Sequence, residues 1–227
     1  MSVTTNILQR TFHIRCREAS GTCFTLDVDG RRYLATARHV VAEIQGDGVI
    51  EIAHGNGKWL PLGVKLVGHG DGGGDVSVLA PQVLFGAPHP LSITTAHLML
   101  AEDIYFLGFP FGMSFDVGDL NAGFPMPLVK RGIVSGLHFE DGLILLDGHN
   151  NPGFSGGPVV RRGTSTEQTV VGLVSAYRYD RNRVLDTDDK PGPYTYDVNT
   201  GIVYVQDVRQ VLRLISDNPI GIEVDQP

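Results

Sequence analysis

The chain has 227 residues, 42% of them hydrophobic, and its 18 Lys and Arg residues are outnumbered by 25 Asp and Glu residues. This length suffices for a sizeable hydrophobic core, in one domain or in two small domains that share an interface. The net charge of −7 gives no electrostatic reason to expect nucleic acid or an anionic membrane as a partner, and neutral or basic partners are easier to accommodate.

The N-terminal residues lack the basic start and the uninterrupted apolar run of a secretory signal peptide. No later stretch approaches the roughly 18 apolar residues that a membrane-spanning helix needs. Two cysteines, Cys16 and Cys23, are too few for a disulfide framework in a chain of this size, although one bridge between them stays open. We therefore expect a soluble protein of a reducing compartment, the cytoplasm.

Short runs rich in Val, Ile, Leu, Phe and Tyr alternate with turn signals along the whole chain, which contains 29 glycines and 13 prolines. This spacing is typical of all-β sandwiches and barrels. The pattern predicts an all-β fold of two closed or nearly closed sheets, with twelve strands at residues 11–17, 21–28, 32–35, 49–53, 58–67, 76–80, 103–109, 128–137, 143–147, 158–161, 169–176 and 201–205.

Two stretches lack a clear strand pattern. Residues 85–95 carry turn residues and prolines, so we place the connection between the two sheets there. Residues 177–200 mix five aspartates with three arginines, and we predict a long exposed loop. A role of this loop at a binding cleft is the alternative.

Helical periodicity occurs only at residues 207–216, where Val208, Val211, Leu212 and Ile215 recur at one face behind an Asp that can cap. The pattern predicts a C-terminal helix that docks on the second sheet. A shorter helical turn is expected within residues 37–44.

Ser155 lies in a glycine-rich turn, residues 151–158, just before an apolar strand. A serine on such a turn is exposed, and backbone N–H groups can converge beside it. Acyl transfer needs both, because the hydroxyl attacks a carbonyl while N–H donors hold the oxygen that becomes negative. Taken alone, a serine in a glycine-rich turn is usually only part of a turn.

Two further segments supply what a serine nucleophile needs. His39 follows a predicted strand, and imidazole is the side chain best suited to remove a hydroxyl proton near neutral pH. Asp75 opens another strand, and a carboxylate there can fix the tautomer and the orientation of the imidazole. Asp71 is the rival of Asp75, because it belongs to the same glycine-rich turn.

The order His39, Asp75, Ser155 and the sequence around each residue resemble the trypsin-like serine proteases, especially the bacterial HtrA (Deg) branch. The resemblance also includes four stretches that contain none of these three residues. They are residues 105–112 (Tyr-Phe-Leu-Gly-Phe-Pro-Phe-Gly), 131–135 (Arg-Gly-Ile-Val-Ser), 171–175 (Val-Gly-Leu-Val-Ser) and 201–205 (Gly-Ile-Val-Tyr-Val). The resemblance covers nearly the whole chain, from about Gly21 to Ser216.

This resemblance implies two six-stranded antiparallel β-barrels with the active site between them and a short C-terminal helix. The first barrel, residues 1–90, carries His39 and Asp75, and the second, residues 91–227, carries Ser155. The implied activity is that of a serine endopeptidase, which hydrolyses peptide bonds of a protein or peptide substrate through an acyl-enzyme without a metal or cofactor. The backbone N–H groups of Gly153 and Ser155 are expected to form the oxyanion hole.

Substrate preference also follows from the resemblance. It places His149 near the base of the primary specificity pocket, and Ser175, Ala176 and Tyr177 on the wall that pairs with the substrate backbone. No carboxylate stands at the base, which is unfavourable for Lys or Arg. Tyr177 favours a small or medium apolar side chain by narrowing the pocket, whereas His149 either contacts a polar or acidic side chain or is tied up within its own loop.

Phe154 departs from the family pattern, which usually has Asp or Asn beside the nucleophile. The ion pair that many secreted members form with a newly cut N-terminus is therefore unavailable, and we do not expect activation by removal of a propeptide. The residues after the helix are too few for a PDZ domain. A catalytically silent, peptide-binding or partner-binding module, in which Phe154 collapses the oxyanion loop, is the alternative function, and an esterase acting on other substrates is a weaker one. The oligomeric state stays open.

Overall fold

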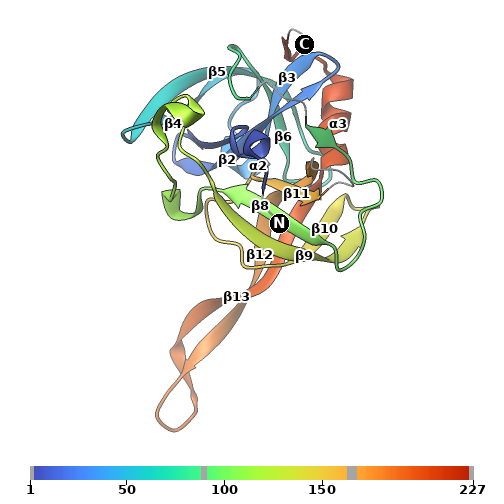
Figure 1. The fold of residues 1–227 in the computed structure, drawn as a ribbon. Coiled ribbons are helices and arrows are strands. Elements are labelled where there is room, and N and C mark those ends of the chain that lie inside the picture. Colours follow the sequence, from blue (N-terminus) through green and yellow to red (C-terminus); the bar gives the residue numbers. More distant parts are fainter. Residues whose placement is uncertain (1–2, 88–90, 163–167, 225–227) are drawn as a thin grey trace.

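A computed structural model describes residues 3–87, 91–162 and 168–224. Two sheets and a C-terminal helix make up most of this structure (Figure 1). The elements are α1 (Thr5–Leu8), β1 (Thr11–Cys16), β2 (Ala19–Val28), β3 (Arg31–Thr36), α2 (Arg38–Val41), β4 (Asp47–His54), β5 (Lys58–His69), β6 (Ser77–Pro81), β7 (Ser92–Ile93), β8 (Asp103–Gly108), the short 3-10 helices Pro110–Gly112 and Gly118–Asn121, β9 (Leu128–His138), β10 (Leu143–Asp147), β11 (Pro158–Arg162), β12 (Gln168–Leu185), β13 (Pro191–Asp207), α3 (Val208–Asp217) and β14 (Ile222–Glu223).

The first sheet has the strand order β14-β3-β2-β1-β4-β5-β6, and an additional pairing between β3 and β6 closes β1–β6 into a barrel. All of its strand pairs are antiparallel. Apolar side chains fill its interior, among them Phe12, Ile14, Phe24, Leu34 and Val78. The twist of six short strands and this apolar interior together favour closure over an open sheet, whose edges would expose unpaired backbone groups.

The second sheet has the order β11-β8-β9-β10-β13-β12-β7, and β11 also pairs with β12. Six antiparallel strands therefore form a second closed barrel, to which β7 adds a short parallel pairing with β12. Ile104, Phe106, Ile144, Val203 and Val205 are among its fully buried residues. The predicted fold of two six-stranded barrels is confirmed.

All twelve predicted strands are present, with ends that differ by a few residues, except that β12 and β13 are much longer than expected. The expected loop at residues 177–200 is wrong. These residues extend β12 and β13 into a two-stranded arm that projects from the second barrel (Figure 1). Because no second layer covers the arm, its sequence lacks the apolar alternation of a barrel strand, and cross-strand pairing holds it instead.

The C-terminal helix is confirmed as α3. Asp207 caps it by accepting a hydrogen bond from the backbone N–H of Arg209 at 2.8 Å, and Val208, Val211 and Ile215 are buried. The helix contacts β5 and β6 of the first barrel as well as β12 and β13 of the second. It therefore packs on both barrels, whereas docking on the second alone was expected. The expected helical turn after β3 is α2.

The boundary expected at residue 90 falls among residues 88–90, outside the described residues. Cys16 and Cys23 are both buried and free, so the bridge that the sequence left open does not form. Burial raises the pKa of the Cys23 thiol. Within the described residues, no helix is long and apolar enough to cross a membrane.

Candidate active site

The pairing of β3 with β6 brings His39 and Asp75 together. Thr36, the last residue of β3, lies opposite Ser77, the first residue of β6. Because the two strands are antiparallel, the residues just after β3 and just before β6 meet at the same end of the barrel. His39 follows β3 in α2, which Val40 and Val41 anchor in the core.

His39 and Asp75 share two hydrogen bonds. The backbone N–H of His39 donates to Asp75 Oδ1 at 3.0 Å, and His39 Nδ1 lies 2.8 Å from Asp75 Oδ2. A carboxylate only accepts, so Nδ1 carries the proton and Nε2 is the basic nitrogen. Nε2 has no hydrogen-bond partner among the described residues, and the His39 side chain is 52% exposed. The imidazole of His39 is therefore held in one orientation with Nε2 accessible.

Ser175 supplies a third hydrogen bond to Asp75, because its hydroxyl donates to Oδ2 at 2.7 Å. Burial by itself would raise the pKa of Asp75, but the hydrogen bonds from His39 and Ser175 outweigh it, and the pKa lies below the usual value. The carboxylate thus stays ionised at neutral pH and supports a protonated imidazole.

The loop that carries Ser155 is held on the first barrel by Thr22 of β2. Its backbone N–H donates to Ser155 O at 2.8 Å, and its hydroxyl donates to Gly153 O at 2.7 Å. Nothing in the sequence marks Thr22, since Gly153 lies 131 residues away. This residue positions the loop across the interface between the barrels.

Ser155 Oγ donates to Ser175 O at 3.3 Å. Ser175 therefore touches both the nucleophile and, through its own hydroxyl, Asp75. The three sequence-predicted residues meet in one network, His39 to Asp75 to Ser175 to Ser155. Among the described residues, Ser155 makes no direct hydrogen bond to His39.

Two amides beside Ser155 are free. The backbone N–H groups of Gly153 and Ser155 donate to no acceptor within the described part of the chain, whereas those of Phe154 and Gly156 are bonded. Gly153 has φ +107°, and a Cβ there would lie 2.2 Å from Phe109 O. Only glycine suits this position. The pair of free donors is what an oxyanion hole requires.

Phe154 is fully buried in the core of the second barrel. Its ring packs edge-on against Phe106 with centroids 5.1 Å apart, and Lys130 Nζ lies 5.5 Å above it. Where the resemblance leads one to expect an acidic or amide side chain, this protein anchors the nucleophile loop in the apolar core of the second barrel.

The residues expected to govern specificity belong to two segments. His149 lies in the loop before Ser155, and Ser175, Ala176 and Tyr177 are consecutive residues of β12. His149 is exposed, and its carbonyl accepts from Lys130 Nζ at 2.6 Å. Asn150, which sequence reasoning missed, is buried between the two segments and donates from Nδ2 to Ala176 O at 3.4 Å. No signal in the sequence marks Asn150, because its burial and its contact with Ala176 arise only in the folded chain.

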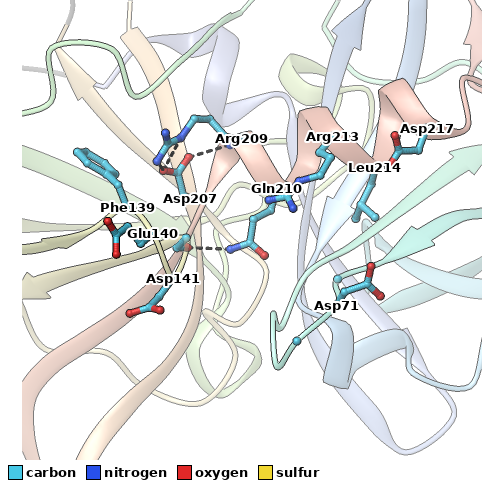
Figure 2. A pocket seen from close by; sticks show the side chains of 13 residues that line it. Asp71, Phe139, Glu140, Asp141, Asp207, Arg209, Gln210, Arg213, Leu214 and Asp217 are labelled. Carbon is cyan, nitrogen blue, oxygen red and sulfur yellow. Dashed lines mark hydrogen bonds and ion pairs between the residues drawn. The ribbon is translucent and has the colours of Figure 1, made fainter.

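Two cavities clarify the surroundings of the site. One, of about 510 Å³, lies where α3 meets the turn at residues 70–72 and the turn at residues 139–142, and it contains Asp71 (Figure 2). Asp71 lines this cavity, while Asp75 contacts His39. Another cavity, of about 740 Å³, is lined by His39 itself together with Arg17 and Glu43. It lies on the side of the imidazole towards the turn between β1 and β2.

Among residues 3–87, 91–162 and 168–224, no group of three or more His, Cys, Asp or Glu side chains could hold a metal ion.

A family model described as a trypsin-like peptidase domain matches residues 21–173. Among solved structures, the chain is similar to the HtrA-type protease AlgW with tripeptide, at 19% identity and a TM-score of 0.59. That likeness covers 94% of this chain and 61% of AlgW, so the chain spans about three fifths of that protein. It is also similar to an inactive form of the Rv3671c protease, at 16% identity and a TM-score of 0.56, over 93% of this chain and 90% of that one. At such identities the likeness shows the fold. No curated protein sequence matches.

Proposed function

Because the chain belongs to the family of trypsin-like peptidase domains, we propose that it is a serine endopeptidase, with Ser155 as nucleophile, His39 as base and Asp75 as orienting acid. The observation that carries the proposal is the hydrogen-bonded network from His39 through Asp75 and Ser175 to Ser155, beside two free amides.

The first half of the reaction forms an acyl-enzyme. Ser155 Oγ turns from Ser175 O towards His39, gives its proton to Nε2 and attacks the carbonyl carbon of the peptide bond. The N–H groups of Gly153 and Ser155 hold the resulting oxyanion, and each such donor contributes roughly 10²–10³ in rate. The intermediate collapses when protonated His39 gives its proton to the leaving amine.

The second half regenerates the enzyme. His39 takes a proton from water, which attacks the acyl carbon and forms a second tetrahedral intermediate. The bond from the acyl carbon to Ser155 Oγ then breaks as protonated His39 returns the proton to Oγ, and the carboxylic acid product is released. Asp75 stays ionised throughout and stabilises the imidazolium, in keeping with its lowered pKa, in which the hydrogen bonds of His39 and Ser175 outweigh burial.

The substrate is a protein or peptide. Ser175, Ala176 and Tyr177 would pair with the backbone before the scissile bond, and the cavity beside His39 would receive the segment that leaves. No carboxylate is expected at the base of the primary pocket, so we propose a preference for a small or medium apolar side chain or, through His149, for a polar or acidic one. Cleavage of a proteome-derived peptide library, with Ser155→Ala as the control, would separate these two preferences.

A fluorophosphonate probe tests the proposal, because it reacts only with an activated serine. We expect one label per folded chain, none in Ser155→Ala and strongly reduced labelling in His39→Ala. Ser114→Ala, a change at an exposed serine away from the network, should keep full labelling.

One observation favours a second function, a catalytically silent peptide-binding module. Ser155 Oγ is directed to Ser175 O and makes no hydrogen bond to His39 among the described residues. If the folded protein takes up no label between pH 6 and pH 9 yet still binds peptides, this function replaces the hydrolase.

A further inference from the structure

The arm of β12 and β13 begins at the active site. At Ser175, β12 touches both Ser155 and Asp75, and from there the strand continues without a break to Leu185. The stretch from Tyr177 to Leu185 is roughly 25 Å long at the rise of an extended strand. A substrate backbone lying along the wall at residues 175–177 would therefore meet the arm directly.

One edge of this stretch has no partner. β13 pairs with β12 along the whole arm, whereas on the opposite edge β11 pairs with β12 only as far as Leu173, followed by the backbone bonds of Gly156 and Gly157 to Val174. Beyond Ala176, whose carbonyl accepts from Asn150, no described strand pairs with that edge. An exposed edge of this length is a template for another extended chain.

The open strand carries a charge opposite to that of the molecule. Residues 177–185 contain Arg178, Arg181 and Arg183 but a single acidic residue, Asp180, in a chain with a net charge of −7. Arg181 forms an ion pair with Asp197 of β13 at 2.7 Å. Arg178 and Arg183 are exposed and have no ion-pair partner in the described part of the chain, so they are available to carboxylates of a bound chain.

On the basis of the proposed function, we infer that the free edge of β12 binds an extended, acidic segment of the substrate as an added strand. Antiparallel pairing is the more stable arrangement and is the one that β12 makes with its long neighbours. A substrate in that direction runs inward towards Ser175, so the segment on the arm precedes the scissile bond. Arg178 and Arg183 then face substrate positions about three to eight residues upstream.

Two matched peptides test the inference. Both carry the same cleavable core, taken from the library profile, behind a ten-residue extension made of Glu in one and of Lys in the other, because Arg178 and Arg183 lie on opposite faces of the strand. We expect kcat/KM for the Glu peptide to exceed that for the Lys peptide about tenfold at low salt, and the ratio to approach one in 1 M NaCl.

A double variant, Arg178→Gln with Arg183→Gln, should reduce this ratio to below about threefold. The control is Lys58→Gln with Lys65→Gln on β5 of the other barrel, which changes the net charge equally and should keep the wild-type ratio. N-methylation of alternate backbone amides in the Glu extension should also remove its advantage, because the added strand could then no longer donate to β12.

A binding measurement separates this inference from the proposed function. In Ser155→Ala, the anisotropy of a fluorescein-labelled Glu peptide reports binding without hydrolysis. Binding that depends on Arg178 and Arg183, with no cleavage by the wild type, would contradict the proposed endopeptidase activity and support peptide binding at the free edge of β12. Cleavage of both peptides at equal rates would contradict substrate binding at the free edge of β12 and would leave the proposed endopeptidase activity supported. A dimer that dissociates in the double arginine variant, with equal rates for both peptides, would assign the edge to a second copy of the chain and overturn the inference.

Discussion

Phe154 holds the loop of Ser155 in place by a different interaction from that of the polar residue that the resemblance leads one to expect there. A polar residue beside the nucleophile would hold its loop through hydrogen bonds or an ion pair, whereas Phe154 holds it by burial against Phe106. The glycines on either side give the backbone the freedom to turn Ser155 outward while Phe154 turns inward. With this ring buried, the backbone N–H groups of Gly153 and Ser155 donate to no acceptor in the described part of the chain.

Removal of the Phe154 ring should therefore destabilise the second barrel. We expect Phe154→Ala to lower the free energy of unfolding by about 3–5 kcal/mol, because a cavity replaces a fully buried ring. Urea unfolding measures this, and Phe111→Ala is the matched control, since that ring is 69% exposed. Equal losses in the two variants would contradict the anchoring role.

His13 is a buried histidine that the mechanism does not use. It stacks on Phe109 with ring centroids 5.1 Å apart, and Nε2 lies 2.9 Å from Ser20 Oγ. Burial, with a smaller effect of the Arg15 charge, lowers the pKa of His13 from 6.5 to about 4. The folded protein therefore keeps this imidazole neutral over a range in which the unfolded chain protonates it.

This difference makes stability depend on pH. The unfolded state binds more protons than the folded state between about pH 6.5 and pH 4, so the free energy of unfolding falls as the pH falls through this window. We expect His13 to account for about 3 kcal/mol of that fall. Urea unfolding at pH 7 and pH 4 should show a smaller fall in His13→Gln than in the wild type, whereas exposed His138→Gln should behave like the wild type.

At the scale of the elements, β3 positions His39 and also carries Arg32, which contacts the connector after the first barrel. Arg32 on this strand is buried, forms an ion pair with Asp27 of β2 at 2.7 Å, and donates to the carbonyls of Phe85, Gly86 and Ala87. It thereby fixes the chain where it leaves the first barrel. A sequence pattern of alternating apolar residues gives no indication of such a contact.

Replacement of Arg32 by Ala should lower the free energy of unfolding much more than replacement of the neighbouring Arg31. Arg32→Ala removes one of the two arginine partners of Asp27, which Arg10 still contacts at 2.8 Å, and leaves three carbonyls of the connector without this donor, so we expect a loss of about 3–5 kcal/mol in unfolding free energy. Arg31→Ala breaks an exposed ion pair with Glu223, which contributes about 0–1 kcal/mol. Thermal or urea unfolding measures both losses. Similar losses of unfolding free energy in the two variants would contradict the role of Arg32 in holding residues 85–87.

In the whole molecule, the candidate active site lies at the interface between the two barrels. β2 of the first barrel holds the nucleophile loop through Thr22, and β12 of the second supplies Ser175 to Asp75 of the first. α3 packs against strands of both barrels and fixes their relative position. The arm lies outside this arrangement, with nearly all of its side chains exposed.

The arm should therefore contribute little to the stability of the barrels. Replacing residues 180–198 by Asn-Gly joins Tyr179 to Asn199, which are already cross-strand partners, through a two-residue hairpin. We expect the melting temperature to change by no more than about 2 °C.

Two point variants on β13 provide the comparison. Val198→Ala, on the arm, should leave stability unchanged, whereas Val205→Ala, in the barrel core, should cost about 2 kcal/mol. A large drop in melting temperature on excision would mean that the arm is part of the folded core.

The local sequence was sufficient to predict the twelve strands, the helix α3, and the three segments around His39, Asp75 and Ser155, because burial in a barrel imposes apolar periodicity and tight turns require glycine. The cytoplasmic location and the division at residue 90 stay predictions. Only the tertiary structure decided what depends on distant pairing. The arm forms through contacts between β12 and β13 and not through burial, so polar composition concealed it. Thr22, Asn150 and Arg32 act through partners far along the chain. Asp75 differs from Asp71 because the pairing of β3 with β6 brings it within hydrogen-bond distance of His39.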